Sequence, residues 1–395
     1  MTPKITSRLP LFLFICLFLS IKGKAFTTST AENRTKQNTS EAKMESSSDE
    51  SNISPNVAGK LEELKQRESE LSRLLAEVRR EKLSTLRSRP LTIGVIGFGR
   101  FGRFIAETFQ KYGRVVVTSR SDYTAIASKM GVKYVPLSKP SEFLNENLDV
   151  IVVAVSILSF ENTISDLAPH LREHLEAKEK EKQVNKVHGP LIVDVLSVKE
   201  HARQVMLELL PLECDILCTH PMFGPDSGKD SWNGLNFVYE KTRVDGVLLN
   251  PDDATTSSSP EEFTDVAGRK HSIHEDNESH VEGIDRIERF LSIWEEEGCR
   301  MIPMSCKTHD SHAANSQFIT HLMGRILGEQ GLSNTPIDTK GFESVLQLID
   351  TTTSDSFDLF YGLYKFNQNS MKTIMTLQAA MNNVVEELKK KEQDV

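Results

Sequence analysis

The sequence is poor in several kinds of residue that mark common protein classes. Its 395 residues include only five cysteines, none in a Cys-x-x-Cys pair, so we expect neither a disulfide scaffold nor a cysteine zinc site. No apolar run reaches the roughly 18 residues of a membrane-spanning helix. Lys and Arg number 47 against 56 Asp and Glu, a net charge of −9. This balance argues against a nucleic-acid partner, because such proteins present a basic face. The length predicts two or three domains.

The first 25 residues have the pattern of a signal peptide. A basic start containing Lys4 and Arg8 precedes an apolar run over 9–21, and small residues follow. Residues 26–57 are rich in Ser, Thr and Asn and cannot form a core. Together the two segments resemble the two-part presequence that directs proteins into a plastid. We therefore expect the chloroplast stroma, without stable membrane association after processing. The alternatives are the secretory pathway and a single N-terminal membrane anchor.

Residues 58–89 are predicted to form a helical extension. Leucines recur there every three or four residues, with charged residues between them, and Pro90 ends the pattern. The heptads are too few for a confident coiled coil, so we expect a helix on the surface or at a dimer contact.

A nucleotide-binding motif comes next. Residues 91–96 are an apolar run of the buried-strand type, and a helical pattern begins after the loop Gly97-Phe98-Gly99-Arg100-Phe101-Gly102. Gly97 permits a tight turn, Gly99 lets the backbone approach a pyrophosphate, and Gly102 lets helix and strand pack closely. The N–H groups of the helix N-terminus would bind the phosphates. All six loop residues are cofactor-binding candidates; the alternative is a tight strand-to-helix turn without a ligand.

The end of the second strand, 114–118, predicts which nicotinamide cofactor binds. NAD-binding proteins carry Asp or Glu here to bond the ribose 2′-hydroxyl, whereas this chain has Ser119, Arg120 and Ser121. An arginine flanked by hydroxyls attracts a 2′-phosphate, so we expect NADP. The alternatives are that Arg120 is a solvated loop charge, or that Asp122 takes the acidic position.

Two more strands of the buried type, 149–155 and 191–195, alternate with helical segments. This pattern predicts an α/β fold with a doubly wound, Rossmann-type sheet over residues 90–245. Ser156 lies at the carboxyl end of the fourth strand, where such sheets bind their ligands. It is therefore a further cofactor-binding candidate.

Two catalytic candidates follow neighbouring strands. Ser197 comes after strand 191–195, and His220 comes after the next strand, 215–218. Both would lie beside the nicotinamide at the carboxyl edge of the sheet. An imidazole, with an ordinary pKa of about 6.5, can take a proton at working pH. His220 is thus the predicted base, although a histidine alone would more often be a structural hydrogen-bonding residue.

Long motifs in a fixed order carry a family resemblance. They are the glycine loop and Thr118–Asp122, Ser156–Ser159, Asp194–Lys199, Asp215–Pro225, His309-Asp310, Ser316–His321, Thr339–Glu343 and Ser354–Leu363. With these motifs the chain resembles plant-type arogenate dehydrogenases, of the arogenate/prephenate dehydrogenase family of tyrosine biosynthesis. The resemblance covers about residues 91–385, apart from two polar stretches.

The resemblance implies oxidative decarboxylation of a cyclohexadienyl substrate. The hydrogen on ring C4 leaves as hydride to the nicotinamide, the 4-hydroxyl loses its proton, and the ring carboxylate leaves as CO2. No metal is needed, because the gain of aromaticity drives the step. The family's catalytic histidine falls on His220. Its hydroxyl partner falls on Ser197, placed to bond the same oxygen and to orient His220.

The second half of the chain predicts an all-helical C-terminal domain, 284–392, that binds substrate and forms a homodimer. Apolar residues recur there at helical spacing. In the family, a histidine late in a long helix reaches the substrate, and it falls on His321. Gln317 and Ser316 lie one turn back near the same face.

Recognition of the substrate carboxylate stays open in this sequence. Bacterial relatives carry an arginine for this purpose where this chain has Gln347. Arg325 and Lys340 are the candidates that would supply the charge instead.

Asp355 is the predicted determinant of substrate preference. Arogenate and prephenate differ in the side chain, which carries an ammonium in the first and a ketone in the second. A carboxylate near that end favours the ammonium and penalises the keto acid. The alternative role of Asp355 is to cap a helix that starts near Ser356.

Residues 246–283 are polar and acidic, and we expect a disordered surface insertion. The whole sequence predicts a homodimeric, NADP-dependent arogenate dehydrogenase. One alternative is a prephenate dehydrogenase that makes 4-hydroxyphenylpyruvate. Another is a nucleotide-binding regulator without catalysis, against which Ser197, His220 and His321 argue.

Overall fold

The structure is a computed structural model that describes residues 55–182, 187–249, 262–264, 270–272 and 277–394. The chain divides into two units, 1–68 and 69–395. Helix α2 (Pro55–Arg87) occupies the segment predicted to be helical and runs across this division. The predicted signal peptide and nearly all of the transit-like segment lie outside the described residues. Among the described helices, none is both long and apolar enough to cross a bilayer.

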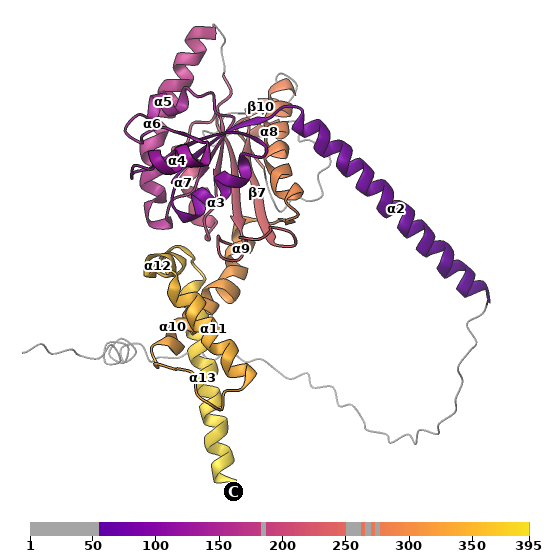
Figure 1. Ribbon diagram of the computed structural model, residues 1–395, viewed down its shortest axis with the longest axis vertical. Helices are drawn as coiled ribbons and strands as arrows, with labels where there is room; N and C mark the ends of the chain where they lie inside the picture. The colour runs from indigo at the N-terminus through magenta and orange to yellow at the C-terminus, as the bar shows by residue number, and fades with distance from the viewer. Residues whose placement is uncertain (1–54, 183–186, 250–261, 265–269, 273–276, 395) are drawn as a thin grey trace, which may run out of the picture. The chain divides into compact units, whose positions relative to one another are not determined.

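A mixed sheet is the centre of the second unit (Figure 1). Within the described residues it has nine strands in the order β11-β7-β6-β5-β4-β1-β2-β3, with β8 paired to β7. The strands from β6 to β3 run parallel, whereas β7 is antiparallel to β6. The strand bounds are β1 Leu91–Ile96, β2 Gly113–Thr118, β3 Lys133–Tyr134, β4 Val150–Val153, β5 Leu191–Asp194, β6 Asp215–Pro221, β7 Asn236–Val244, β8 Val247–Leu248 and β11 Arg300–Pro303.

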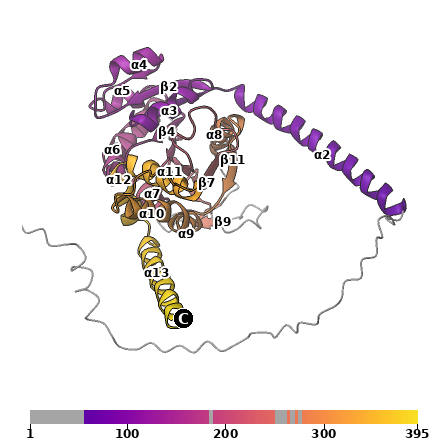
Figure 2. The same cartoon turned by 60° about the horizontal axis from the view of Figure 1, so that its bottom comes forward.

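Helices pack on both faces of this sheet (Figures 1 and 2). On one face, Phe109 of α3 meets Trp294 of α8, with ring centroids 5.8 Å apart. The other face packs α5, α6 and α7. The helix bounds are α3 Arg100–Phe109, α4 Thr124–Met130, α5 Pro140–Leu144, α6 Ile157–Lys182, α7 Glu200–Leu209 and α8 Asn277–Glu296. Strands β4 and β5 are buried along their whole length, as their unbroken apolar runs require when both faces are covered. The predicted Rossmann-type sheet is therefore confirmed.

The residues expected to form a disordered insertion, 246–283, contain regular structure where they are described. Strand β8 lies at their start, β9 (Glu262–Thr264) pairs antiparallel with β10 (Lys270–Ser272), and α8 begins at Asn277. The expectation of disorder is therefore wrong for these residues. A polar composition does not exclude a short hairpin, because its backbone hydrogen bonds are formed between its own strands.

The first part of the predicted all-helical domain, 284–392, belongs instead to the sheet, because α8 packs on the sheet and β11 is its edge strand. From Cys306 onward the C-terminal region is helical, as predicted. It contains α9 (Cys306–Ala313), a π-helical turn η1 (Ala314–Phe318) and α10 (Ile319–Gly328), followed by α11 (Lys340–Ser354), α12 (Phe357–Phe366) and α13 (Ser370–Gln393). Helices α9, η1 and α10 follow one another without a break, in place of the single long helix predicted to carry His321. Single π turns are rare and occur often at functional sites.

Candidate active site

The glycine loop has the geometry that a dinucleotide requires. Gly97 has φ +100°, and a Cβ there would collide with the carbonyl oxygen of Ala154. A Cβ on Gly102 would collide with the carbonyl oxygen of Gly97. Gly99, at the N-cap of α3, has nothing within 4 Å of its Cβ position. The loop is therefore packed where the turn needs glycine and open where a pyrophosphate would approach.

The other loop side chains divide between core and surface. Phe98 is fully buried against Tyr123, so its side chain belongs to the core, and its predicted cofactor contact is limited to the backbone. Phe101 is half-buried beside Phe104. Arg100 is exposed, and its Nη2 donates to both carboxylate oxygens of Asp226, at 2.9 and 3.0 Å. Because Asp226 follows β6, this pair ties the glycine loop to the segment just after His220.

At the end of β2, Arg120 stays available for a ligand. Its side chain is exposed and forms no hydrogen bond or ion pair in the described part of the chain. Asp122, the competing candidate, accepts hydrogen bonds from the backbone N–H of Thr124 at 2.9 Å and from its hydroxyl at 2.6 Å. These bonds lower the pKa of Asp122 and tie its carboxylate to the start of α4.

The remaining cofactor candidates are less distinctive. The carbonyl oxygens of Ser119 and Ser121 accept from the Tyr134 hydroxyl. Ser156 is exposed just before α6, and its hydroxyl donates to the Ser159 hydroxyl at 3.0 Å. These contacts hold the loops that follow β2 and β4, at the same edge as the glycine loop.

A chain of three buried side chains lies at the end of β6. The Nδ1 atom of His220 is 2.8 Å from Nε2 of His309, and Nδ1 of His309 is 2.8 Å from Oδ1 of Asp310. His220 and His309 are each 3% exposed, and Asp310 is fully buried. The carboxylate of Asp310 also accepts from the backbone N–H groups of Lys199 and Glu200, at 2.8 and 2.9 Å.

The hydrogen bonds within His220, His309 and Asp310 determine which ring nitrogens of the two histidines carry a proton. The Asp310 carboxylate is an acceptor, so Nδ1 of His309 donates to it and Nε2 of His309 carries a lone pair. That lone pair accepts from Nδ1–H of His220, which leaves Nε2 of His220 unprotonated and able to accept a proton. Burial lowers the pKa of His220 well below its ordinary value, and the neighbouring His309 ring and Lys199 ammonium lower it further. His220 is therefore neutral, as a base must be.

A buried lysine forms hydrogen bonds that join the two strands at the same site. Lys199 is 2% exposed, and its ammonium contacts Oδ1 of Asp194 and donates to the carbonyl oxygen of Thr219 at 2.5 Å. Thr219 in turn donates its hydroxyl to the backbone oxygen of Asp194 at 2.6 Å. These bonds join the ends of β5 and β6, and the residue next to His220 is thereby fixed.

Ser197 does not orient His220 as predicted. It lies just after β5, half-buried, and no hydrogen bond joins its hydroxyl to His220 in the described part of the chain. His309 makes that contact instead. In the sequence, His309 and Asp310 were noted only as part of a family motif, without a role at the site. The available indication was the adjacent pair His309-Asp310 within a shared motif.

Three of the predicted substrate residues line one side of η1 and α10. Gln317, His321 and Arg325 are spaced four residues apart, so they share a helix face. Each carries a buried polar atom without a hydrogen-bond partner among the described residues: Oε1 of Gln317, Nδ1 of His321 and Nε of Arg325. Buried polar atoms are normally paired, so this row indicates a polar ligand.

Asp355 closes one end of this row. One of its carboxylate oxygens lies 3.9 Å from Nε2 of His321, and its backbone oxygen accepts from Arg325 at 2.7 Å. It does not cap α12, because Ser356 does so by accepting from the N–H of Leu359. The alternative role as a helix cap is therefore wrong.

The other substrate candidates are not brought to this row. Lys340 is 93% exposed and pairs with Glu343 at 2.7 Å. Ser316 is exposed and donates its hydroxyl to the carbonyl oxygen of His312 at 2.8 Å. Gln347 is exposed on α11. Of the two cations considered for the substrate carboxylate, Arg325 is the one beside His321.

A Rossmann-type sheet with an open glycine loop and a buried imidazole at the same sheet edge defines a nicotinamide-dinucleotide-dependent oxidoreductase. The model of the family described as NADP oxidoreductase, coenzyme F420-dependent, matches residues 92–175. The model described as TYRAAT1-like, C-terminal domain, matches residues 326–395.

The chain belongs to the arogenate dehydrogenase family. It is 40% identical over 303 residues to arogenate dehydrogenase 2, chloroplastic, of Arabidopsis thaliana, covering 76% of this chain and 71% of the relative. It is 42% identical over 299 residues to arogenate dehydrogenase 1, chloroplastic, of the same plant, covering 75% of this chain and 39% of that longer relative. The fold is similar to that of A. aeolicus prephenate dehydrogenase solved with hydroxyphenyl propionate and NAD+. The TM-score is 0.52 at 13% identity, over 77% of this chain and 93% of the other.

Proposed function

We propose that the protein catalyses the NADP-dependent oxidative decarboxylation of arogenate to tyrosine. The observation that carries the proposal is the chain His220–His309–Asp310, which leaves an unprotonated imidazole nitrogen at the edge of the sheet that bears the glycine loop. The family relationship to arogenate dehydrogenases supports the same substrate.

His220 is the proposed acceptor of the proton that the substrate loses. Its Nε2 would accept the proton of the substrate 4-hydroxyl, while the hydrogen on ring C4 leaves as hydride and the ring carboxylate leaves as CO2. The phenolate formed by aromatisation would take the proton back. His309 holds the receiving ring in one tautomer, and Ser197 would bond the same substrate oxygen from the end of β5. His220 and Ser197 are thus the proposed catalytic residues.

The substrate would be held by the polar row on η1 and α10. Arg325 supplies the positive charge for a carboxylate, and its planar guanidinium suits a two-point contact. His321 and Gln317 would bond polar groups of the same molecule. Asp355 would pair with the ammonium that arogenate has and prephenate lacks. If prephenate were bound there, its ketone would leave the carboxylate of Asp355 without a cationic partner, which is costly.

The cofactor would bind through the glycine loop and Arg120. Bound NADP supplies the nicotinamide that accepts the hydride. The open position at Gly99 leaves room for the pyrophosphate. The guanidinium of Arg120, which has no partner among the described residues, suits a 2′-phosphate better than a bare hydroxyl.

We also propose a homodimer and a plastid location. Large apolar side chains are exposed along the C-terminal helices, including Phe357 at 65%, Met381 at 62%, Val384 at 57% and Leu388 at 63%. Such a surface is typical of a protein–protein interface. The location rests on the predicted presequence and on relatives whose names describe them as chloroplastic.

The test is a steady-state assay of the recombinant protein, without its predicted presequence, that follows the absorbance of reduced nicotinamide. Arogenate and prephenate are each supplied with NADP and with NAD. The proposal predicts the highest kcat/KM for arogenate with NADP, and tyrosine as the product by chromatography. Higher kcat/KM for prephenate would favour a prephenate dehydrogenase, and no turnover in any combination would favour a regulator.

A further inference from the structure

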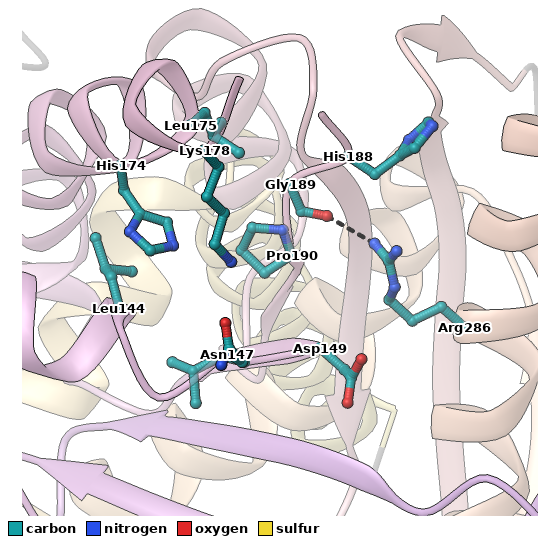
Figure 3. Close-up of a pocket in the computed structure, with 11 residues that line it drawn as sticks. Leu144, Asn147, Asp149, His174, Leu175, Lys178, His188, Gly189, Pro190 and Arg286 are labelled. Atoms are coloured by element: carbon teal, nitrogen blue, oxygen red, sulfur yellow. Dashed lines mark hydrogen bonds between the residues drawn. The ribbon is translucent and has the colours of Figure 1, made fainter. Parts of the chain in front are cut away.

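A cavity of about 160 Å³ lies at the amino edge of the sheet, the edge away from His220 (Figure 3). It opens where β4 and β5 begin, and the second half of α6 and the helix α8 complete its wall. Its wall includes Asn147, Asp149, His174, Lys178, His188 and Arg286. None of these residues takes part in the proposed reaction, so the cavity is a separate feature of the fold.

Basic side chains outnumber acidic ones in this wall. Lys178, Arg286, His174 and His188 face a single carboxylate, Asp149. One oxygen of that carboxylate already accepts from the backbone N–H of Thr92 at 2.8 Å. Among the charged and titratable residues of the wall, basic groups therefore predominate.

Two of the four basic groups are already engaged. Arg286 donates to the carbonyl oxygen of Gly189 at 2.7 Å and lies 3.4 Å from Asp215. His188 lies 3.5 Å from Asp245. In Figure 3 the guanidinium of Arg286 points toward Gly189, and the ring of His188 points away from the cavity.

The other two basic groups have no hydrogen-bonded partner among the described residues, and Lys178 has only the longer-range attraction of Glu181 and Asp149. His174 and Lys178 lie one turn apart on α6, and both point from that helix toward Asn147 in Figure 3. Neither makes a hydrogen bond or an ion pair within the described part of the chain. Burial lowers the pKa of each, and the charge of Lys178 lowers that of His174 further. A half-buried ammonium without an acceptor is unfavourable in the empty protein.

We propose that this cavity binds a small oxyanion, a phosphate or a carboxylate group, through the ammonium of Lys178 and the ring of His174. The volume suits such a ligand, because it equals about five water molecules at about 30 Å³ each. An anion there would supply the acceptors that both side chains lack. Charge-assisted hydrogen bonds of this kind are the strong ones.

The test uses inorganic phosphate and, in a second arm, malonate, at constant ionic strength set with sodium chloride. The full chain is saturated with NADP, so that the glycine loop does not bind the added anion. Binding is measured by isothermal titration calorimetry and by the rise in melting temperature that a ligand of the folded state produces. The arm with the tighter binding identifies the ligand as a phosphate or a carboxylate.

The variants are chosen to separate binding from folding. Lys178→Met keeps the apolar stem and removes the charge, and it should weaken anion binding at least tenfold. His174→Asn should weaken it less, and Lys178→Arg should retain most of it. Lys180→Met, an exposed position on the same helix, is the matched control and should bind as the wild type does.

Stability without an anion gives a second readout. Lys178→Met should melt no lower than the wild type in anion-poor buffer, because it removes an unpaired, partly buried charge. Failure of this variant to fold would contradict the proposal, since it would mean that Lys178 stabilises the empty protein. Absence of any anion binding by the wild type, or equal binding by Lys178→Met, would also overturn it.

Discussion

Replacement of His309 by leucine tests the proposed role of the buried histidine chain. In the wild type, Nε2 of His309 accepts the Nδ1–H of His220 at 2.8 Å, and both rings are 3% exposed. Leucine fills most of the volume but accepts nothing. The ring of His220 then loses the bond that keeps its basic nitrogen toward the substrate, and the other tautomer becomes accessible.

The size of the effect follows from the cost of an unmade buried hydrogen bond. Leaving such a donor unsatisfied costs about 1–3 kcal/mol. If the variant must spend that free energy to restore the productive tautomer and orientation of His220, the activation barrier rises by the same amount, and kcat falls by about 5- to 150-fold. His309→Gln, whose amide oxygen can accept from His220, should recover part of the loss.

The pH profile separates orientation from simple damage. A base works only when deprotonated, so the rate falls as the pH drops below the pKa of His220. Burial, His309 and Lys199 hold that pKa below its ordinary value, so wild-type activity should persist below about pH 6.5. His309 is one of the causes that lower this pKa, so in its absence the pKa of His220 rises and the acidic limb should move to higher pH.

The assay is kcat against pH with saturating arogenate and NADP, with circular dichroism to check folding. His312→Leu, at an exposed position three residues along the same helix, is the control and should behave as the wild type. A folded His309→Leu enzyme with wild-type kcat and an unmoved acidic limb would refute the role of His309.

Four further substitutions test the cofactor and substrate sites. Arg120→Ser should raise the KM for NADP by about 10- to 100-fold, the loss of one or more bonds to a charged group, with little change for NAD; an equal effect on both cofactors would contradict the assignment. Asp355→Asn should lower kcat/KM for arogenate and raise that for prephenate, and an unchanged ratio of the two in the same assay would reject Asp355 as the determinant. Gly97→Ala should destabilise the protein by about 1–3 kcal/mol in denaturant unfolding, since it places a Cβ at φ +100°. Gly99→Ala, whose Cβ meets nothing within 4 Å, should leave stability nearly unchanged and weaken nucleotide binding measured by fluorescence titration; the reverse pattern would contradict the roles given to the two glycines.

The parts of the fold that depend on local sequence were predictable. The strand at 91–96, the glycine loop and the helix after it follow one another in the chain, so their pattern is visible without tertiary information. Strand β7 was missed, because its buried positions include Glu240 and Arg243. These residues are tolerated inside because Glu240 pairs with Arg203 at 2.8 Å and Arg243 donates to the carbonyl oxygen of Cys214 at 3.1 Å. Such partners come from distant segments, so the strand has no apolar run.

The same limit applies to the candidate site. His220 could be proposed from its position after a strand, but its partner His309 is 89 residues away in the chain. Only the packing of α9 against the sheet brings the two rings together. The exclusion of Lys340 and Ser316 from the polar row also needed the structure, because spacing alone does not tell which face of a helix is covered.

The π turn η1 determines how the two halves of the site are directed. Each residue advances an α-helix by about 100°, and a π turn accommodates one residue more than the regular helix. His309 and Asp310, before this turn, face the sheet, whereas His321 and Arg325 come after it. Deletion of one residue within Ala314–Phe318 would rotate the later pair by about a quarter of a revolution while the earlier pair stayed in place. A sequence change that keeps every reactive group could therefore abolish turnover, simply by misaligning the groups that hold the substrate with the group that takes its proton.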